Sequence, residues 1–451
     1  MGRRSMGIKI IETDYNNNKF WEEKTDVTAG ANMMRVINIY PEFTYQKING
    51  FGGAFTEASG YNLSRLPKEV QEDILKAYFS EEGLQYNLCR THINSCDFAL
   101  GNYAYVEDEK DTEFESFDIS RDQKYIIPMI KSASAMMKEE MILLASPWSP
   151  SAFMKTNGEM NHGGKLKEEF YGQWAKYIAR YIREYAAIGI KISMVTVQNE
   201  PMAVQTWDSC IYETEDEMRF VRDYLGPELE KEGLGDVKIL VWDHNKEILF
   251  DRASGVLEDM DAAKYTAGVA FHWYSGDHFE SISMVREKYP DKELYFTEGC
   301  VEYSRFADSN EVTKAEMYAH DILGNLQAGT NGYMDWNLLL DELGGPNHVK
   351  NYCAAPIMCD TVAKTMEKRL SYYYIGHFSR YVKRGAVRVA TTRFTDKVEA
   401  VAFKNPDGSL VTVLLNRTDE DIWLSLREVG VADGENSFTL KAHSICTVVE
   451  E

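Results

Sequence analysis

The chain has 451 residues, 44% of them hydrophobic, and carries 49 Lys and Arg against 71 Asp and Glu, a net charge of −22. So acidic a chain is repelled by phosphate backbones and anionic lipid surfaces, and we expect neither nucleic acid nor membrane as a partner. No apolar run reaches the roughly 18 residues of a membrane span, and no signal peptide opens the chain. The seven cysteines lack paired spacing, which predicts reduced thiols and a cytoplasmic protein.

Eight short apolar runs bounded by Gly, Pro, Asn or Asp predict β-strands. Amphipathic segments such as 67–79, 167–187 and 214–231 lie between them and predict helices. Strands that alternate with helices of this length pair in parallel, and eight such units over roughly 320 residues fit a (β/α)8 TIM barrel. The predicted strands cover residues 48–55, 86–96, 141–147, 192–198, 237–243, 267–273, 293–297 and 332–340.

The two ends of the chain show a different pattern. After a helical-looking stretch at 361–382, the period of the apolar residues changes from about 3.6 to 2, which indicates short antiparallel strands. The runs 8–12 and 34–40 have the same character. We predict N-terminal strands in residues 1–45, a catalytic barrel in 46–380 and further strands in 381–451. The first and third parts form one antiparallel β-sandwich attached to the barrel.

Two glutamates are predicted at strand ends. Glu200 follows the fourth strand in the segment Asn199-Glu200-Pro201, and Glu298 ends the seventh. Proline disfavours the α region for the residue before it, so Glu200 should be extended. Catalytic residues of a barrel collect at the C-terminal ends of its strands. Two carboxyl groups there favour glycoside hydrolysis, which needs one acid for the leaving oxygen and one carboxylate facing the anomeric carbon.

Aromatic residues at other strand ends suit a sugar, because a pyranose ring needs a flat apolar surface and polar groups for its hydroxyls. A single tryptophan usually packs in a core, but three or four at one barrel mouth favour a pyranose site. His272 and Tyr274 lie two residues apart on one face of the sixth strand; alone, such a histidine is more often a structural residue. The tryptophans at predicted strand ends are Trp148, Trp242, Trp273 and Trp336.

No pattern indicates a cofactor or a metal. The segment 158–165 resembles a phosphate-binding loop, but Gly164 stands where the lysine belongs. The chain has no His-x-x-x-His or Cys-x-x-Cys pair. We therefore expect neither a bound cofactor nor a metal ion.

Several motifs together resemble those of glycoside hydrolase family 30, the lysosomal glucosylceramidase family, whose members are retaining β-glycosidases with a (β/α)8 barrel and a β-sandwich. The resemblance implies that Glu200 is the acid/base and Glu298 the nucleophile. It also implies that Asp97, Trp148, Asn199, Trp336 and Asn347 line the glucose site, with His272 and Tyr274 close to the nucleophile. The matching motifs lie at residues 49–56, 95–98, 145–150, 154–158, 198–201, 272–274 and 344–347.

We therefore expect a retaining β-glucosidase of glucosylceramidase type, acting on a carbohydrate or glycolipid through a covalent glycosyl-enzyme. Glu200 should hold a proton while Glu298 is ionised, and their carboxyl groups should lie roughly 5 to 5.5 Å apart. A β-1,6-glucanase or β-xylosidase would use the same pair on another glycan. Loss of either glutamate would have favoured a non-catalytic carbohydrate-binding barrel, but both are present.

Overall fold

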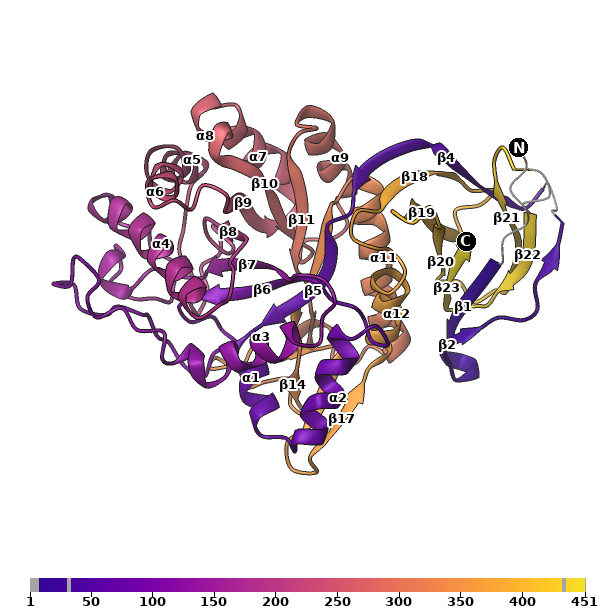
Figure 1. Cartoon of the computed structure of the whole chain (residues 1–451), viewed down its shortest axis with the longest axis horizontal. Coiled ribbons are helices and arrows are strands. Elements are labelled where there is room, and N and C mark those ends of the chain that lie inside the picture. The colour runs from indigo at the N-terminus through magenta and orange to yellow at the C-terminus, as the bar shows by residue number, and fades with distance from the viewer. Residues whose placement is uncertain (1–7, 31–33, 432–434, 451) are drawn as a thin grey trace.

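The computed structural model describes residues 8–30, 34–431 and 435–450. Eight parallel strands form a closed barrel, as the sequence predicts (Figure 1). The order of the strands around the ring is their order in the sequence. After each strand, the connecting segment brings the chain back to the end of the barrel where the next strand begins. The strands are β5 (Gly50–Phe55), β6 (Leu88–Ile93), β7 (Ile142–Pro147), β8 (Met194–Thr196), β9 (Lys238–Asn245), β10 (Thr266–His272), β11 (Glu293–Glu298) and β13 (Gly332–Asn337).

Two successive layers of inward-facing side chains fill the barrel. The first layer is apolar, and seven strands contribute one buried side chain each to it. Two residues further along several strands, the next inward position carries a buried polar side chain, as at Arg90, Ser146, Thr196 and His272. The apolar layer therefore closes the barrel beneath a polar layer that faces its C-terminal mouth. The apolar layer consists of Leu88, Leu144, Met194, Leu240, Ala270, Tyr295 and Met334.

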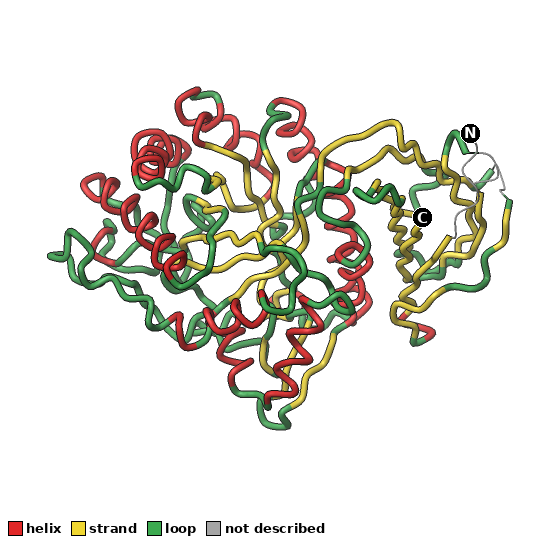
Figure 2. The backbone as a smooth tube through the Cα atoms, in the orientation of Figure 1, coloured by secondary structure: helices red, strands yellow, loops and turns green. Residues whose placement is uncertain are grey.

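Helices surround the barrel, as the tube in Figure 2 shows in red around the strands. Helix α4 (Tyr171–Ala187) illustrates why, since Trp174, Ile178 and Tyr181 recur at helical spacing and are all buried. The predicted helix 214–231 consists of α5, a π-helical turn at Phe220–Leu225 and α6. The other helices are α1 (Glu57–Ser64), α2 (Lys68–Phe79), α3 (Ile126–Ser134), α5 (Thr214–Arg219), α6 (Gly226–Lys231), α7 (Leu249–Leu257), α8 (Met260–Tyr265), α9 (Phe279–Lys288), α10 (Tyr303–Phe306), α11 (Glu311–Ala328) and α12 (Leu370–Ser379).

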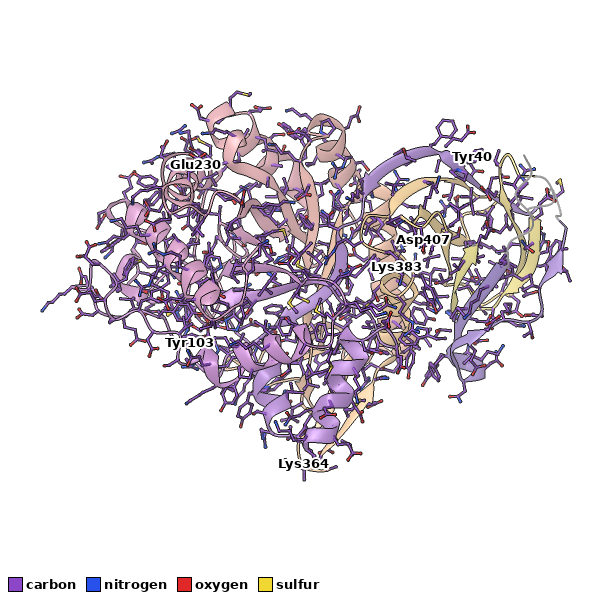
Figure 3. All side chains as sticks on the ribbon, viewed as in Figure 1. Tyr40, Tyr103, Glu230, Lys364, Lys383 and Asp407 are labelled. Carbon is purple, nitrogen blue, oxygen red and sulfur yellow. The ribbon has the colours of Figure 1, made fainter. Side chains whose placement is uncertain are left out.

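The prediction of a helix over 361–382 is only partly right, because its first residues belong to a β-hairpin. The chain turns after Asp360, whose Oδ1 accepts the backbone N–H groups of Val362 and Ala363 at 2.8 and 2.7 Å. Lys364 follows with φ 62 and lies at the tip of this hairpin (Figure 3). An aspartate that bonds the backbone ahead of it favours a turn over a helix. The remaining short strands are β12 (Val301–Glu302), β14 (Leu340–Asp341), β15 (Cys353–Ala354), β16 (Ile357–Asp360) and β17 (Thr365–Lys368).

Strands from both ends of the chain form the β-sandwich beside the barrel, shown at the right of Figure 1. β1 pairs with β23 from Ile8 opposite Glu450 to Asp14 opposite Ser444, so the first and last described strands are neighbours. The pairs are antiparallel except that β4 runs parallel to β21. The strands are β1 (Ile8–Asp14), β2 (Lys19–Glu23), β3 (Thr28–Ala29), β4 (Val36–Lys47), β18 (Val387–Thr392), β19 (Val398–Lys404), β20 (Leu410–Asn416), β21 (Ile422–Glu428), β22 (Glu435–Leu440) and β23 (Ser444–Glu450).

Helix α12 joins the two bodies, since it contacts barrel strand β5 and sandwich strands β1 and β23. Its buried His377 bonds Thr13 and Thr447 of the sandwich through its two ring nitrogens, both at 2.8 Å. No helix in the described part of the chain is long and apolar enough to cross a membrane.

Candidate active site

Arg90 is the centre of the polar layer in the barrel. Its side chain is fully buried, and Nη1 donates to Oε2 of Glu298 at 2.8 Å. Nη2 donates to Oδ2 of Asp243 at 2.7 Å and to Oδ1 of Asn199 at 2.9 Å. The guanidinium also lies 4.7 Å from the ring centroid of Trp148. One charged group therefore orients residues from three other strands and loops.

A β-bulge places Asp243 in this layer. Trp242 and Asp243 have φ values of 75 and 56. The register between β9 and β10 jumps there, since Ala270 pairs with Trp242 but Phe271 pairs with His244. Asp243 is therefore the extra residue of the bulge, and the bulge re-aims its carboxylate into the barrel.

Four hydrogen bonds satisfy the carboxylate of Asp243. Oδ1 lies 3.0 Å from Nε2 of His272 and accepts from Thr297 Oγ1 at 2.6 Å. Oδ2 accepts from Thr196 Oγ1 at 2.7 Å as well as from Arg90. Burial raises the pKa of Asp243, but Arg90 and His272 lower it more, so this pKa lies well below its usual range. Asp243 is an ionised acceptor that holds Arg90 and His272 in place.

Glu200 lies beyond the end of β8 and is not extended, contrary to the sequence prediction. Its φ is 50, in the left-handed region. The backbone N–H of Glu200 donates to the carbonyl of Asp243 at 3.0 Å, and its own carbonyl accepts from Ala203 at 2.9 Å. Proline disfavours only the right-handed α region here, and these bonds select a turn instead of a strand. Because of this turn, both Asn199 and Glu200 reach the same cavity.

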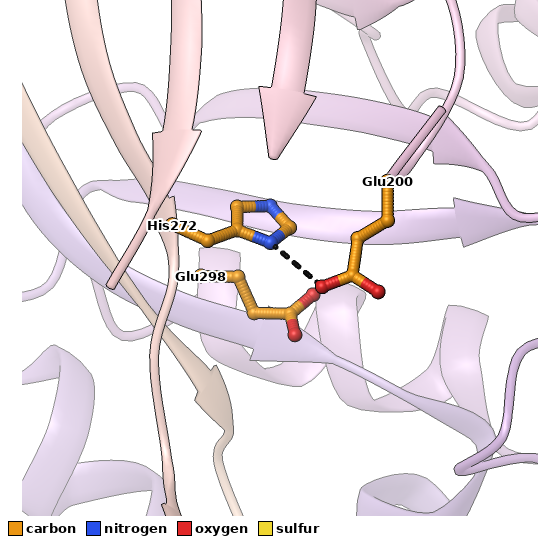
Figure 4. Close-up of side chains that lie close together, drawn as sticks. All are labelled: Glu200, His272 and Glu298. Atoms are coloured by element: carbon orange, nitrogen blue, oxygen red, sulfur yellow. Dashed lines mark hydrogen bonds and ion pairs between the residues drawn. The ribbon is translucent and has the colours of Figure 1, made fainter. Parts of the chain in front are cut away.

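His272 connects Asp243 to Glu200. Its Nδ1 lies 3.3 Å from Oε1 of Glu200, the contact drawn in Figure 4. Burial lowers the pKa of His272, but the charges of Glu298, Asp243 and Glu200 raise it more, to about 9. Burial also raises the pKa of Glu200, yet His244 and His272 outweigh it, so the net direction is downward. In the substrate-free enzyme the proton expected on Glu200 therefore lies mainly on His272, at the other end of the same contact.

Glu298 accepts from two donors, Arg90 Nη1 at 2.8 Å and Tyr274 Oη at 3.0 Å. Burial and the charge of Glu200 raise the pKa of Glu298, and these donors, together with His272, act against the rise. One oxygen of Glu200, one oxygen of Glu298 and one ring nitrogen of His272 all lie within 4.8 Å of one another. The two carboxyl groups therefore face each other closely across the cavity.

Asp97 lines the same cavity, and Asn347 and Asn351 donate to its Oδ2 at 3.1 and 3.3 Å. Burial, with a contribution from the charge of Glu298, raises the pKa of Asp97 to about 8. The rings of Trp148 and Trp336 stack beside it, with centroids 5.2 Å apart and planes 15° apart. These residues offer a carboxyl group and a flat indole surface next to Glu298.

One cavity brings together most of the residues that the sequence predicts for the site. His272 is fully buried behind the two glutamates, and Asn347 holds Asp97 without lining the cavity. Trp242 and Trp273 do not line it either, because Trp242 packs against Arg252 and Trp273 against Tyr318, with the Trp273 centroid 4.9 Å away. The predicted residues that line the cavity are Asp97, Trp148, Asn199, Glu200, Tyr274, Glu298 and Trp336.

Sequence reasoning missed the central residue, Arg90. The signal was present, because Arg90 is a charged residue inside the apolar run Leu88–Ile93, and a fully buried charge requires partners. Asn351 was also missed, four residues after the expected Asn347. The further cavity-lining residues are Gln205, Trp207, His244, Asn245, Cys300, Glu302, Asn351 and Cys353.

Glu200, His272 and Glu298 also form the one group of three potential metal-ligating side chains found in the described part of the chain. In this structure His272 and Glu200 are in hydrogen-bond contact with each other, while Glu298 accepts from Arg90 and Tyr274. The absence of a metal and of a cofactor stays a prediction from the sequence.

Comparison with known proteins agrees with this architecture. Residues 48–382 match the glycosyl hydrolase family 30 TIM-barrel domain, and residues 385–448 match the beta sandwich domain of the same family. Lysosomal acid glucosylceramidase of Mus musculus is 35% identical over 87% of this chain and 79% of its own length. An endo-1,6-beta-D-glucanase of Neurospora crassa is 27% identical over 88% and 85%.

Solved structures are similar over nearly the full length. SrfJ from Salmonella typhimurium is 39% identical, with a TM-score of 0.94 over 98% of this chain and 99% of that one. The endo-beta1,6-glucanase BT3312 is 28% identical, with a TM-score of 0.88 over the same shares. With both domain models matched in order and these relatives aligned along the chain, the protein belongs to glycoside hydrolase family 30 and is a glycoside hydrolase.

Proposed function

We propose that the protein is a retaining β-glucosidase in which Glu298 is the nucleophile and Glu200 the acid/base. The observation that carries this proposal is the short separation of the two carboxyl groups, with one oxygen of each within 4.8 Å. Retaining enzymes hold their carboxyl groups about 5 to 5.5 Å apart, whereas inverting enzymes need about 6.5 to 9.5 Å to admit a water between them.

The first step forms a glycosyl-enzyme. Glu298 attacks the anomeric carbon, and Arg90 and Tyr274, which donate to its carboxylate, hold it in position. Glu200 protonates the leaving oxygen with the proton that it shares with His272. Asn199, oriented by Arg90, is placed to bond the sugar 2-hydroxyl, a contact that strengthens in the oxocarbenium-like transition state.

The second step hydrolyses this intermediate. Once Glu298 is esterified, its negative charge is lost, and the pKa of His272 falls because Glu298 was its largest favourable partner. Glu200 then accepts a proton from water as that water attacks the anomeric carbon. His272 lets Glu200 act first as an acid and then as a base, because the two share one proton.

The sugar is best assigned as glucose. Asp97 and the stacked Trp148 and Trp336 rings supply a carboxyl group for sugar hydroxyls and a flat surface for the ring face. The relatives named as glucosylceramidase and as endo-1,6-glucanase support a glucosyl group at this position. We propose glucosylceramide as the substrate, with a β-1,6-glucan as the alternative that the glucanase relatives favour. All seven cysteines are free and buried, which supports action in a reducing cytoplasm.

Two variants test the roles. Glu298→Gln should abolish turnover because an amide cannot form the glycosyl ester, and the variant should still fold because Arg90 keeps its ion pair with Asp243. Glu200→Gln should retain activity on aryl β-glucosides whose leaving group needs no protonation, and azide should rescue it with a β-glycosyl azide product. An α-glycosyl azide would rule out retention. Glu280→Gln, on the exposed face of α9, is the matched control.

Rates on four substrates then separate the alternatives: an aryl β-glucoside, an aryl β-xyloside, a β-1,6-glucan and glucosylceramide. Turnover of the xyloside above the glucoside would contradict the assignment of the sugar. Turnover of the glucan above glucosylceramide would favour the second candidate.

A further inference from the structure

A second histidine borders the catalytic cavity, and its environment is the reverse of that of His272. His244 directly follows the bulge at Asp243, and its ring centroid lies 6.4 Å from that of His272. Both nitrogens of His272 have partners, Glu200 and Asp243. Neither nitrogen of His244 bonds a described residue, and its Nδ1 is buried without a partner. Buried polar groups are normally paired, so this one requires an explanation.

The same wall of the cavity carries other free polar groups. The Oδ1 of Asn245 accepts from the backbone of Tyr274 at 3.0 Å, but its Nδ2 bonds no described residue. The side-chain amide of Gln205, which lines the same cavity, also bonds none of them. Trp207 lines the cavity as well and packs against the cluster that contains Trp148 and Trp336. We call His244, Asn245, Gln205 and Trp207 the outer wall. It combines unused donors and acceptors with one flat aromatic surface.

His244 lies on the Glu200 side of the cavity. The backbone N–H of Glu200 donates to the carbonyl of Asp243, the residue before His244, and both side chains line the same cavity. Burial lowers the pKa of His244 itself and, together with His272, outweighs the charge of Glu200, so the neutral ring is favoured. A neutral imidazole offers one donor and one acceptor at once. A hydroxyl group, which is both donor and acceptor, complements it.

We propose that His244 binds the leaving group, through a hydroxyl, amine or amide that lies two or three carbons from the glycosidic oxygen. This inference rests on the proposed function, because the leaving oxygen must lie next to Glu200. A hydrogen bond there holds the leaving oxygen in line with its proton donor, and the unpaired ring selects against leaving groups that cannot satisfy it. The required chemistry is shared by a second sugar and by the polar head of a sphingoid lipid.

The test compares substrates within one enzyme preparation, so that the fraction of folded protein cancels. Three β-glucosides have alkyl leaving groups of similar size: 2-hydroxyethyl, 2-methoxyethyl and propyl. We expect His244→Phe, which keeps a ring but has no nitrogen, to lower kcat/KM for the hydroxyethyl glucoside roughly 10-fold more than for the propyl glucoside. His244→Gln should recover part of this selectivity, and His278→Asn, at a residue that does not line the cavity, should change none of it.

Equal losses on the three glucosides would overturn the proposal, as would a shift of the pH profile without any change in selectivity. The latter outcome would mean that His244 acts only on the pKa of Glu200. Gentiobiose and glucosylsphingosine distinguish the two sources of leaving group: the His244→Phe loss should be larger on whichever is the better substrate, and a loss on neither overturns the proposal. If the proposed function itself is wrong, azide will not rescue Glu200→Gln, whatever His244 does.

Discussion

The inner part of the catalytic cavity, by which we mean Arg90, Glu200, Asp243, His272 and Glu298, is built in the opposite way to its outer wall. In the inner part, the carboxylate of Asp243 accepts four hydrogen bonds. Arg90 donates to acceptors on five residues. Each of these charged groups is therefore held by several partners. In the outer wall, His244 and Gln205 have no side-chain partner in the described part of the chain. The chemistry at the anomeric carbon is the same for every substrate, so its dipoles are preorganised. The leaving group varies, and its binding groups are left unpaired until it arrives.

The inner part is therefore expected to couple activity to stability, whereas the outer wall is expected to separate them. Removing one partner of a buried ion pair leaves an uncompensated charge, which is costly for the fold and for the site alike. Removing an unpaired group leaves nothing uncompensated. Four variants or conditions test this difference.

The largest effect is expected for Asp243→Asn. Arg90 and His272 each lose one of their two acidic partners, so kcat should fall by about 10² to 10³. The free energy of unfolding should fall by about 3 kcal/mol, measured by chemical denaturation. Asp321→Asn is the control, because Asp321 is a buried partner of Lys246 that does not line the cavity, so this variant should lose stability without loss of kcat. An Asp243 variant with normal kcat would contradict the role given to the inner part.

Asp97→Asn should have the next largest effect. If Asp97 holds the remote hydroxyls of glucose, kcat/KM should fall about 10- to 100-fold, about 1.4 to 3 kcal/mol of transition-state binding. A preference for glucose over sugars that lack or invert those hydroxyls should also narrow. Early unfolding with unchanged kcat and KM in the folded fraction would instead make Asp97 a structural carboxyl group.

The stability of this variant should also depend on pH in a defined direction. The pKa of Asp97 is raised to about 8 in the folded protein, so the neutral form is favoured there. The wild type should therefore lose stability as pH rises from about 4, the unfolded pKa, to about 8. The amide introduced by Asp97→Asn does not titrate, so the Tm of the variant relative to the wild type should increase over this window.

A smaller effect should appear in the pH profile. The pKa of His272 is about 9, so the proton shared with Glu200 is lost above that pH. For substrates that need an acid, kcat/KM should fall about tenfold per pH unit on this limb. An aryl glucoside with a good leaving group should show a weaker limb because it needs no protonation. Identical limbs for both substrates would show that the shared proton is not the one transferred.

The smallest effect is expected in the outer wall. Trp207→Ala should raise KM for glucosides with bulky leaving groups by about 2- to 10-fold, the value of one aromatic contact. Its Tm should stay within about 2 °C of the wild type, since the side chain is only partly buried where it packs against the cluster of Trp148 and Trp336. Trp423→Ala, on the exposed face of the β-sandwich, is the control. A large loss of stability would show that the outer wall also supports the fold.

The local pattern of apolar residues was sufficient to predict the barrel and the β-sandwich. The apolar runs at residues 48–55 and 332–340 predicted barrel strands because parallel strands are buried on both faces and need continuous apolar sequence. The change of period after residue 382 predicted the strands of the sandwich. Glu200 and Glu298 were found because each ends a predicted strand, which is where a barrel places its chemistry.

Only the tertiary structure decided how the site is assembled. The left-handed backbone at Glu200 depends on a bond to the carbonyl of Asp243, and Asp243 itself points inward because strand pairing leaves it as the extra residue of a bulge. Arg90 could be noticed as a buried charge, but its partners lie from about 50 to more than 200 residues away along the chain. Backbone conformations and charge networks of this kind are set by contacts between distant segments, whose energies no local pattern of residues contains.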